Sequence, residues 1–206
     1  MQKTALYIAI LVAAGILIWM LFFWQYEAGD GHATSIQGLA PQPSGGDFSL
    51  ISDRGPISLS DYRDKIVLLY FGYTWCPDIC PTNLALIAST LSEMDVVERL
   101  QVQPLFISVD PERDTPQRLK EYVEYFHPSF IGLTGSKPDI DEIVGRYGAA
   151  YRIVEKRADA PYVVDHTADT YIIDKQGKLI RKMPHGTSVE ELLGALRPLF
   201  QENLSR

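Results

Sequence analysis

Hydrophobic residues occur along this chain in three patterns. Residues 5–24 (ALYIAILVAAGILIWMLFFW) form one continuous apolar run of twenty positions without a charged side chain. Residues 66–71 (IVLLYF) and 105–109 (LFISV) are shorter runs rich in β-branched and aromatic side chains, which predict strands covered on both faces. Over much of the remaining chain, apolar side chains recur every three or four positions, as they do along one face of a helix.

The helical pattern occurs after each apolar strand and again at the end of the chain. Thr115 followed by Pro116 predicts the start of one of these helices, and Ser188 with Glu191 forms a capping box before the last. The positions expected to face the core are Leu84, Ile87, Leu91 and Met94, then Leu119, Tyr122, Val123 and Phe126, then Ile140, Ile143, Val144 and Tyr147, and finally Leu192, Leu193, Leu196 and Phe200.

Shorter strands complete the predicted sheet. Residues 48–51 and 54–59 predict a strand, a turn and a strand, and residues 170–174 and 179–183 predict a hairpin around Gly177. The order strand, helix, strand, helix, hairpin, helix is that of the thioredoxin fold. We therefore expect an α/β, thioredoxin-like domain in which helices flank a central mixed sheet.

The run at residues 5–24 predicts a transmembrane helix. Twenty residues at about 1.5 Å each reach about 30 Å, the thickness of the hydrocarbon core of a bilayer. A cleaved signal peptide is the competing interpretation, but its apolar part is usually only about 7–15 residues long. The run ends in tryptophan and phenylalanine, as membrane interfaces favour, and Lys3 before it places residues 1–4 in the cytoplasm.

Residues 25–45 are rich in glycine, alanine, proline and glutamine and predict a flexible linker. Residues 46–206 then form the globular domain. Because no Arg- and Ser-rich transit peptide precedes the anchor, we expect a single-pass protein of a bacterial inner membrane with its domain in the periplasm. The 19 basic and 26 acidic residues give a net charge of −7, and no basic cluster indicates a nucleic-acid partner.

The two cysteines of the chain, Cys76 and Cys80, lie four positions apart where a strand passes into a helix. A purely structural disulfide is a weak explanation, because closing so short a loop removes little chain entropy. The first-turn N–H groups of a helix stabilise thiolates, so we expect reactive sulfurs. If the first turn that holds both cysteines is helical, the two sulfurs lie on one helical face. Two such thiolates form either a dithiol/disulfide couple or a soft metal site suited to Cu(I).

A third copper ligand would come from a histidine. His32, in the linker, together with His127 and His185 are expected to be solvated. His166 directly precedes the predicted strand at Thr170, and in a thioredoxin fold that loop faces the active-site cysteines. Asp165 is a candidate for the carboxylate that orients the histidine ring.

Three segments of the chain resemble the SCO/SenC family of membrane-anchored copper proteins: YFGYTWCPDICP (70–81), SVDPERDTP (108–116) and VDHTADTYIID (164–174). The resemblance implies a thioredoxin-like fold that binds Cu(I) or Cu(II) through Cys76, Cys80 and His166. It further implies a metallochaperone for the CuA-bearing subunit of cytochrome c oxidase, supplied by an upstream copper donor or thiol reductant. The two cysteines would also form a redox-active disulfide, and in the reduced dithiol form they would reduce the oxidised cysteines of that subunit.

Charged residues near these motifs suggest a docking rim for the partner. They are Asp78, Asp110, Glu112, Arg113 and Asp114, and a solvated turn and helix cap is the alternative interpretation.

Two rival functions use the same sulfurs. A periplasmic thiol-disulfide oxidoreductase would exchange electrons through a mixed disulfide at Cys76 and Cys80. Such enzymes usually have Cys-x-x-Cys and a cis-proline before the strand that here begins near Thr170, and this chain has neither. A copper or redox sensor is the second rival. The sequence leaves open whether the chain is an enzyme.

Overall fold

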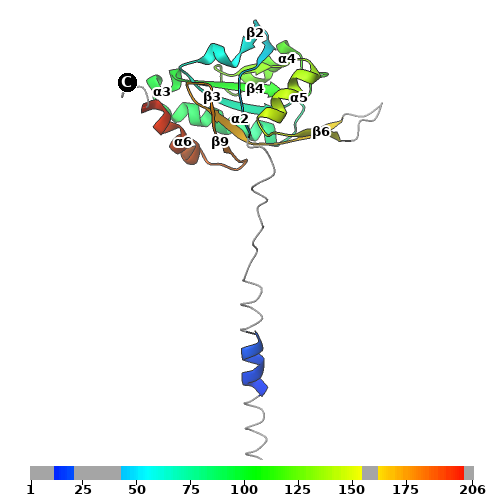
Figure 1. Ribbon diagram of the computed structural model, residues 1–206, viewed down its shortest axis with the longest axis vertical. Coiled ribbons are helices and arrows are strands. Elements are labelled where there is room, and N and C mark those ends of the chain that lie inside the picture. Colours follow the sequence, from blue (N-terminus) through cyan, green and yellow to red (C-terminus); the bar gives the residue numbers. More distant parts are fainter. Residues whose placement is uncertain (1–11, 21–42, 155–161, 202–206) are drawn as a thin grey trace, which may run out of the picture. The chain divides into compact units, whose positions relative to one another are not determined.

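A computed structural model describes residues 12–20, 43–154 and 162–201, within two separate units at 1–41 and 42–206 (Figure 1). Residues 12–20 are helical with exposed side chains. None of the helices within these described ranges is long and apolar enough to cross a membrane. Residues 5–11 and 21–24 of the predicted anchor, and the predicted linker as far as residue 42, lie outside these ranges, so both remain predictions.

The larger unit is built on a five-stranded mixed sheet in the order β5-β4-β3-β8-β9. Strands β3, β4 and β5 run parallel, whereas β8 and β9 are antiparallel to their neighbours. These strands are Ile66–Gly72 (β3), Val102–Ser108 (β4), Ile131–Leu133 (β5), Thr170–Ile173 (β8) and Leu179–Met183 (β9). The expectation of an α/β domain with a central mixed sheet is confirmed.

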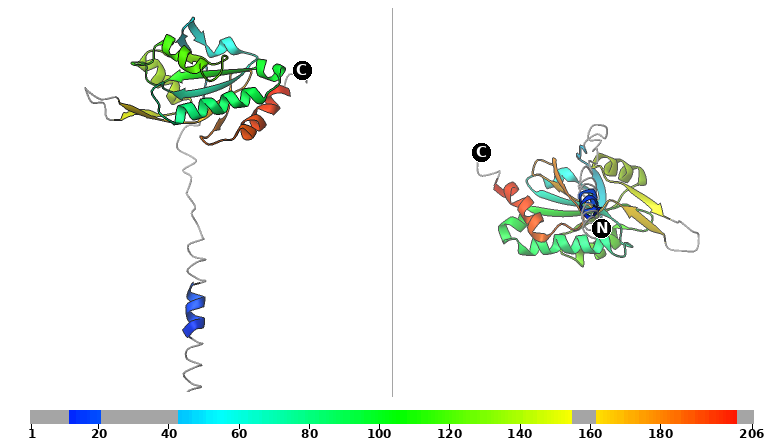
Figure 2. Two further views of the ribbon diagram at one scale, coloured as in Figure 1. Left: turned by 180° about the vertical axis from the view of Figure 1, so that it is seen from behind. Right: turned by 90° about the horizontal axis from the view of Figure 1, so that it is seen from below.

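Helices cover both faces of this sheet. Figures 1 and 2 show α2 (Ile79–Glu93) and α6 (Val189–Gln201) on one side, with α4 (Pro116–Glu124) and α5 (Lys137–Arg146) on the other. The predicted caps are present: the Thr115 side chain accepts a hydrogen bond from the Arg118 N–H. Two short elements that the sequence analysis did not anticipate, α3 (Val96–Leu100) and a 3-10 helix η1 (Leu59–Tyr62), complete the helices of the described domain.

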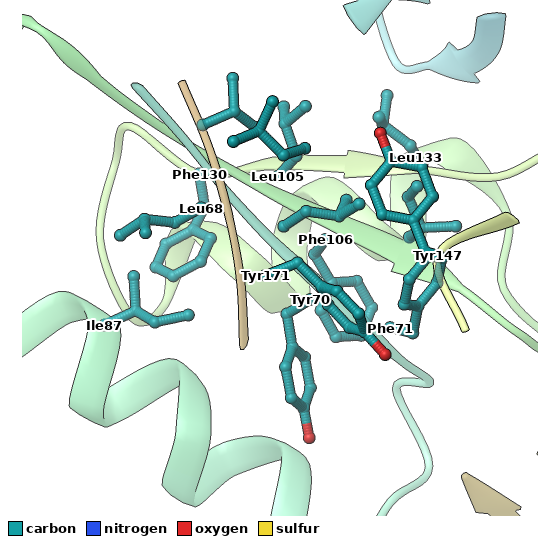
Figure 3. Packing of buried hydrophobic residues seen from close by; sticks show 14 of the residues in the cluster. Leu68, Tyr70, Phe71, Ile87, Leu105, Phe106, Phe130, Leu133, Tyr147 and Tyr171 are labelled. Carbon is teal, nitrogen blue, oxygen red and sulfur yellow. The ribbon is translucent and has the colours of Figure 1, made fainter. Parts of the chain in front are cut away.

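The core is centred on β3, all seven residues of which are buried. Figure 3 shows Phe71 among Phe106, Tyr147 and Tyr171, and its ring centroid lies 5.4 Å from that of Tyr171. Burying one such side chain stabilises the fold by about 1.5–3 kcal/mol. The strand therefore forms a rigid base for the residues that follow Gly72.

The structure differs from the sequence prediction beyond the sheet. The segment around His166, expected to be a loop before Thr170, instead forms the strand β7 (Val163–His166). It pairs with β6 (Tyr151–Val154), which the sequence did not predict, in a second, two-stranded antiparallel sheet. Both strands are largely exposed, so their apolar positions do not form the buried run that identifies a central strand. A third pair, β1 (Ser49–Ser52) and β2 (Gly55–Ser58), forms the predicted strand, turn and strand.

Candidate metal centre

The two cysteines lie at the start of α2, directly beyond the central strand. Cys80 is fully buried and belongs to the first turn of the helix, whereas Cys76 is half-buried and precedes the helix by three residues. Cys76 thus lies outside the helix, and the condition under which both sulfurs would share one helical face is not met. The expected stabilisation by the helix start is nevertheless present, since the Cys80 N–H donates to Cys76 Sγ at 3.4 Å.

Gly72 allows Cys80 to approach the strand. A Cβ atom at position 72 would lie 2.7 Å from Cys80 Sγ and 2.8 Å from the Phe106 ring, far inside van der Waals contact. On the same side of the strand, the Tyr70 hydroxyl lies 3.9 Å from Cys80 Sγ. The last residue of β3 therefore has to be glycine, because the Cys80 sulfur fills the space that a side chain at position 72 would need.

His166 reaches the cysteines from the end of β7. Its Nε2 lies 3.2 Å from Cys80 Sγ, although the two residues are 86 positions apart. The imidazole ring meets Tyr70 and Tyr73 edge-on, with ring centroids 6.1 and 5.8 Å away. The histidine is thus held between two aromatic rings from the β3 side of the site.

Hydrogen bonding defines the tautomer of His166. Its Nδ1 lies 2.9 Å from the carbonyl oxygen of Thr167. Because a carbonyl can only accept, Nδ1 carries a hydrogen, and in the neutral ring the lone pair is then on Nε2, on the side of the sulfur. A neutral imidazole with a free Nε2 is the form that binds a metal ion.

Asp165 does not orient the histidine, and that prediction is wrong. Its carboxylate accepts hydrogen bonds from Nε and Nη2 of Arg152, at 3.0 and 2.9 Å. Consecutive residues of a strand point to opposite sides, so a carboxylate next to His166 in sequence faces away from it. The backbone of Thr167 takes the role expected of Asp165.

The pKa values of the two thiols are shifted in opposite directions. Hydrogen bonds from the Cys80 side chain and from the Cys80 N–H lower the pKa of Cys76 to about 3. Burial raises the pKa of Cys80 above its ordinary value, and the neighbouring Cys76 sulfur raises it further. At neutral pH the pair therefore consists of a Cys76 thiolate and a protonated Cys80.

Cys76, Cys80 and His166 are the one group of three metal-ligating side chains found within the described residues, with ligand atoms within 4.8 Å of one another. The donor set of two sulfurs and one imidazole nitrogen fits a soft ion such as Cu(I). His127 and His185 do not belong to this group. His127 contacts Ser129, and His185 contacts Asn83.

The site opens to solvent on one side. A surface depression is lined by Tyr73, Cys76, Ile79, Val163 and His166. A bound ion at the Cys76 sulfur would therefore be accessible to a partner's ligands, while Cys80 closes the site from below.

Two members of the predicted docking rim are not on the surface. Asp110 and Asp114 are 2% and 1% exposed, so the rim prediction is wrong for these residues. Asp114 accepts hydrogen bonds from Thr74 and Ser108, and Asp110 pairs with Arg113. Buried carboxylates need such partners, and the sequence did not show which donors would supply them.

A model of the SCO1/SenC family matches residues 37–201 of this sequence. The chain belongs to this family. A SCO2-like protein of Rickettsia conorii is 41% identical over 155 residues, which cover 74% of this chain and 75% of that protein. The mitochondrial SCO2 homolog of Bos taurus is 35% identical over 198 residues, which cover 95% of this chain and 74% of that protein.

Solved structures of SCO proteins share the fold. The copper-bound structure of Arabidopsis thaliana ScoI is 38% identical, with a TM-score of 0.70 over 76% of this chain and 98% of that one. Copper-bound Bradyrhizobium japonicum ScoI is 35% identical, with a TM-score of 0.69 over 76% of this chain and 99% of that one. The thioredoxin-like architecture expected from the sequence is thereby confirmed.

Proposed function

We propose that this SCO/SenC protein is a copper metallochaperone that holds copper through Cys76 Sγ, Cys80 Sγ and His166 Nε2. The observation that carries the proposal is the convergence of these three ligand atoms, from segments 86 positions apart, to within 4.8 Å. Copper-bound structures of two related proteins, the ScoI proteins of A. thaliana and B. japonicum, support the choice of metal.

The site suits an ion that is carried and then handed over. Two thiolates and a neutral imidazole give a total charge of −1 with Cu(I) and 0 with Cu(II), so both oxidation states are tolerated electrostatically. Three protein ligands leave one side of the ion open at the surface depression. Transfer can then proceed by ligand exchange, in which a partner's thiolate enters while Cys76, the more exposed sulfur, is displaced.

The physiological acceptor follows from the family resemblance. We propose delivery to the CuA-bearing subunit of cytochrome c oxidase, with copper or electrons received from an upstream copper donor or thiol reductant. The predicted anchor at residues 5–24 would hold the domain on the periplasmic side of a bacterial inner membrane, near that subunit.

Copper titration of the full-length protein tests the ligand set. The reduced protein, kept in mild detergent because of the predicted anchor, is titrated with Cu(I) in competition with a chromophoric chelator. We expect one equivalent to bind, and we expect His166→Ala to weaken binding by about 100-fold, at the upper end of the loss that supporting groups of metal sites cause. His185→Ala is the matched control, since His185 contacts Asn83 rather than the cysteines. Equal affinities of wild type and His166→Ala would refute the three-ligand site.

The lowered pKa of Cys76 and the raised pKa of Cys80 support a second function. A half-buried thiolate at Cys76 beside a buried, protonated Cys80 is the arrangement of a thiol-disulfide oxidoreductase. Cys76 would attack a substrate disulfide, and Cys80 would then release the reduced substrate as the Cys76–Cys80 disulfide forms. Two electrons pass from the protein to the substrate, and the upstream reductant restores the dithiol.

An insulin-reduction assay distinguishes the two functions. Rapid turnover that persists in His166→Ala, together with weak copper binding by the wild type, would favour the oxidoreductase. Tight copper binding with turnover near background would favour the chaperone.

A further inference from the structure

The two halves of the metal centre belong to different parts of the fold. The cysteines follow β3 of the five-stranded sheet, whereas His166 ends β7 of the separate β6–β7 pair. Among the described residues, the β6 and β7 strands pair only with each other. Contacts other than strand pairing therefore help to set the distance between the sulfurs and the imidazole. Residues 110–114, which follow β4, contact both halves.

On the cysteine side, the contact is Asp114. Its buried carboxylate accepts from the Thr74 N–H at 3.0 Å, from the Thr74 hydroxyl at 2.6 Å and from the Ser108 hydroxyl at 2.6 Å. Thr74 lies two residues before Cys76, so these bonds fix the turn that presents the half-buried sulfur of Cys76. The start of α4 does not need Asp114, because Thr115 already caps that helix.

On the histidine side, the contacts are Arg113 and Asp110. Arg113 Nη1 donates to the carbonyl oxygen of Tyr162 at 2.9 Å, and its guanidinium lies 3.6 Å from the centroid of the Tyr162 ring. The Tyr162 hydroxyl donates to Asp110 Oδ1 at 2.7 Å, and Arg113 forms an ion pair with the same aspartate. Tyr162 immediately precedes β7, so these bonds fix the start of the strand that ends at His166.

One more hydrogen bond joins β7 directly to the cysteine loop. The Val164 N–H donates to the Tyr73 hydroxyl at 3.3 Å. The Arg113 guanidinium also lies 5.6 Å from the centroid of the Tyr73 ring. Arg113 therefore contacts both aromatic side chains that hold β7 against the cysteine loop.

We propose that residues 110–114 position the two halves of the centre separately: Asp114 fixes the cysteine loop, and Arg113 with Asp110 fixes the strand that carries His166. This inference rests on the proposed copper function. Arg113 and Asp114 are neighbours in sequence, yet Arg113 bonds the strand that carries His166, whereas Asp114 bonds the loop that carries Cys76. Their effects on binding therefore depend differently on whether the histidine is present.

A double-mutant cycle in the full-length protein tests this assignment. We expect Arg113→Gln to weaken Cu(I) binding by about 10-fold when His166 is present, as loss of a supporting contact does at other metal sites, and by less than about 2-fold in the His166→Ala background. Asp114→Asn is expected to weaken binding by similar factors in both backgrounds. Arg181→Gln, at an exposed arginine of β9, is the matched control and should leave the Cu(I) affinity unchanged in both backgrounds. An equal loss for Arg113→Gln in both backgrounds, or no loss in either, would overturn the proposal.

A second measurement needs no copper. In the metal-free protein, hydrogen exchange at the Val164 amide should accelerate in Arg113→Gln, whereas amides of β3 and α2 should keep their wild-type rates. Tyr162→Phe removes the hydroxyl that bonds Asp110 but keeps the ring that lies against Arg113, and it should accelerate the same amide less. Unchanged exchange at Val164 in both variants would overturn the positioning role. A failure of the copper function would appear separately, as equal copper affinity of wild type and His166→Ala.

Discussion

His166 Nε2 lies 3.2 Å from Cys80 Sγ, and Nδ1 on the other side of the same ring bonds the backbone of Thr167. Nε2 therefore faces a sulfur that burial keeps protonated. This contact makes the metal-free site a hydrogen-bonded assembly already close to the geometry of the proposed bound one. It also implies that copper competes with a proton for Cys80.

Copper binding should release about one proton per ion at neutral pH. Cys76 is already a thiolate because its pKa is about 3, whereas burial raises the pKa of Cys80 and keeps that sulfur protonated. Calorimetric Cu(I) titration in buffers of different ionisation enthalpy measures the number. The Cys80→Ser variant should release close to none, and release of two protons by the wild type would contradict a preformed thiolate.

Cys76 should react as a thiolate far below the ordinary thiol range. The lowered pKa predicts an iodoacetamide alkylation rate that is nearly constant from about pH 8 to about pH 5 and declines only as the pH approaches about 3. Mass spectrometry of the alkylated site gives the rate for each cysteine. A midpoint near the ordinary value of about 8.5 would contradict the hydrogen-bonded thiolate.

The lowered pKa of Cys76 also determines how the stability of the fold changes with pH. The folded-state pKa of Cys76 lies below its unfolded value, so its contribution to stability is fully present above the unfolded pKa and is lost as the pH falls toward about 3. Cys80 has the opposite sign, because its raised pKa stabilises the fold below the unfolded value. The difference in melting temperature between wild type and Cys76→Ser should therefore shrink on acidification.

Gly72→Ala should damage both the fold and the site. The added methyl group would meet Cys80 Sγ at 2.7 Å, and such overpacking costs about 1–3 kcal/mol in the free energy of unfolding. Chemical denaturation measures the loss. Gly194→Ala is the matched control, since nothing lies within 4 Å of its added Cβ on α6, and it should stabilise by about 0.5–1 kcal/mol. Equal effects of the two changes would contradict close packing at Gly72.

Asp165→Asn should leave copper affinity within about 2-fold of wild type. The carboxylate pairs with Arg152 on the exposed side of β7, and exposed ion pairs contribute about 0–1 kcal/mol. The competition titration used for His166 provides the measurement. A 10-fold loss would show that Asp165 acts on the histidine after all.

Most of the fold could be predicted from the sequence because its signals are local. The apolar run of β3, the caps of α4 and α6 and the turn at Gly177 each depend on neighbouring residues. The β6–β7 pair gave no such signal, since its strands are half-exposed and short.

The candidate site also has features that the sequence predicted and features that it did not. The residue types and spacing of Cys76, Cys80 and His166 indicated a soft metal site, and the fold brings them together. The burial of Asp110 and Asp114 could not be predicted, because their partners Tyr162 and Thr74 lie 52 and 40 positions away. A local sequence pattern does not contain such distant pairings.

The separation of His166 from Cys80 gives copper a second effect. An ion bound to both residues closes a chain loop of 86 positions and joins the β6–β7 pair to the central sheet. Because the unfolded chain cannot hold the same three ligands together, loading should raise the melting temperature and slow proteolysis near β7. The transported ion is then also a structural crosslink. A molecule that has delivered its copper differs from a loaded one in the stability of the β6–β7 pair as well as in charge.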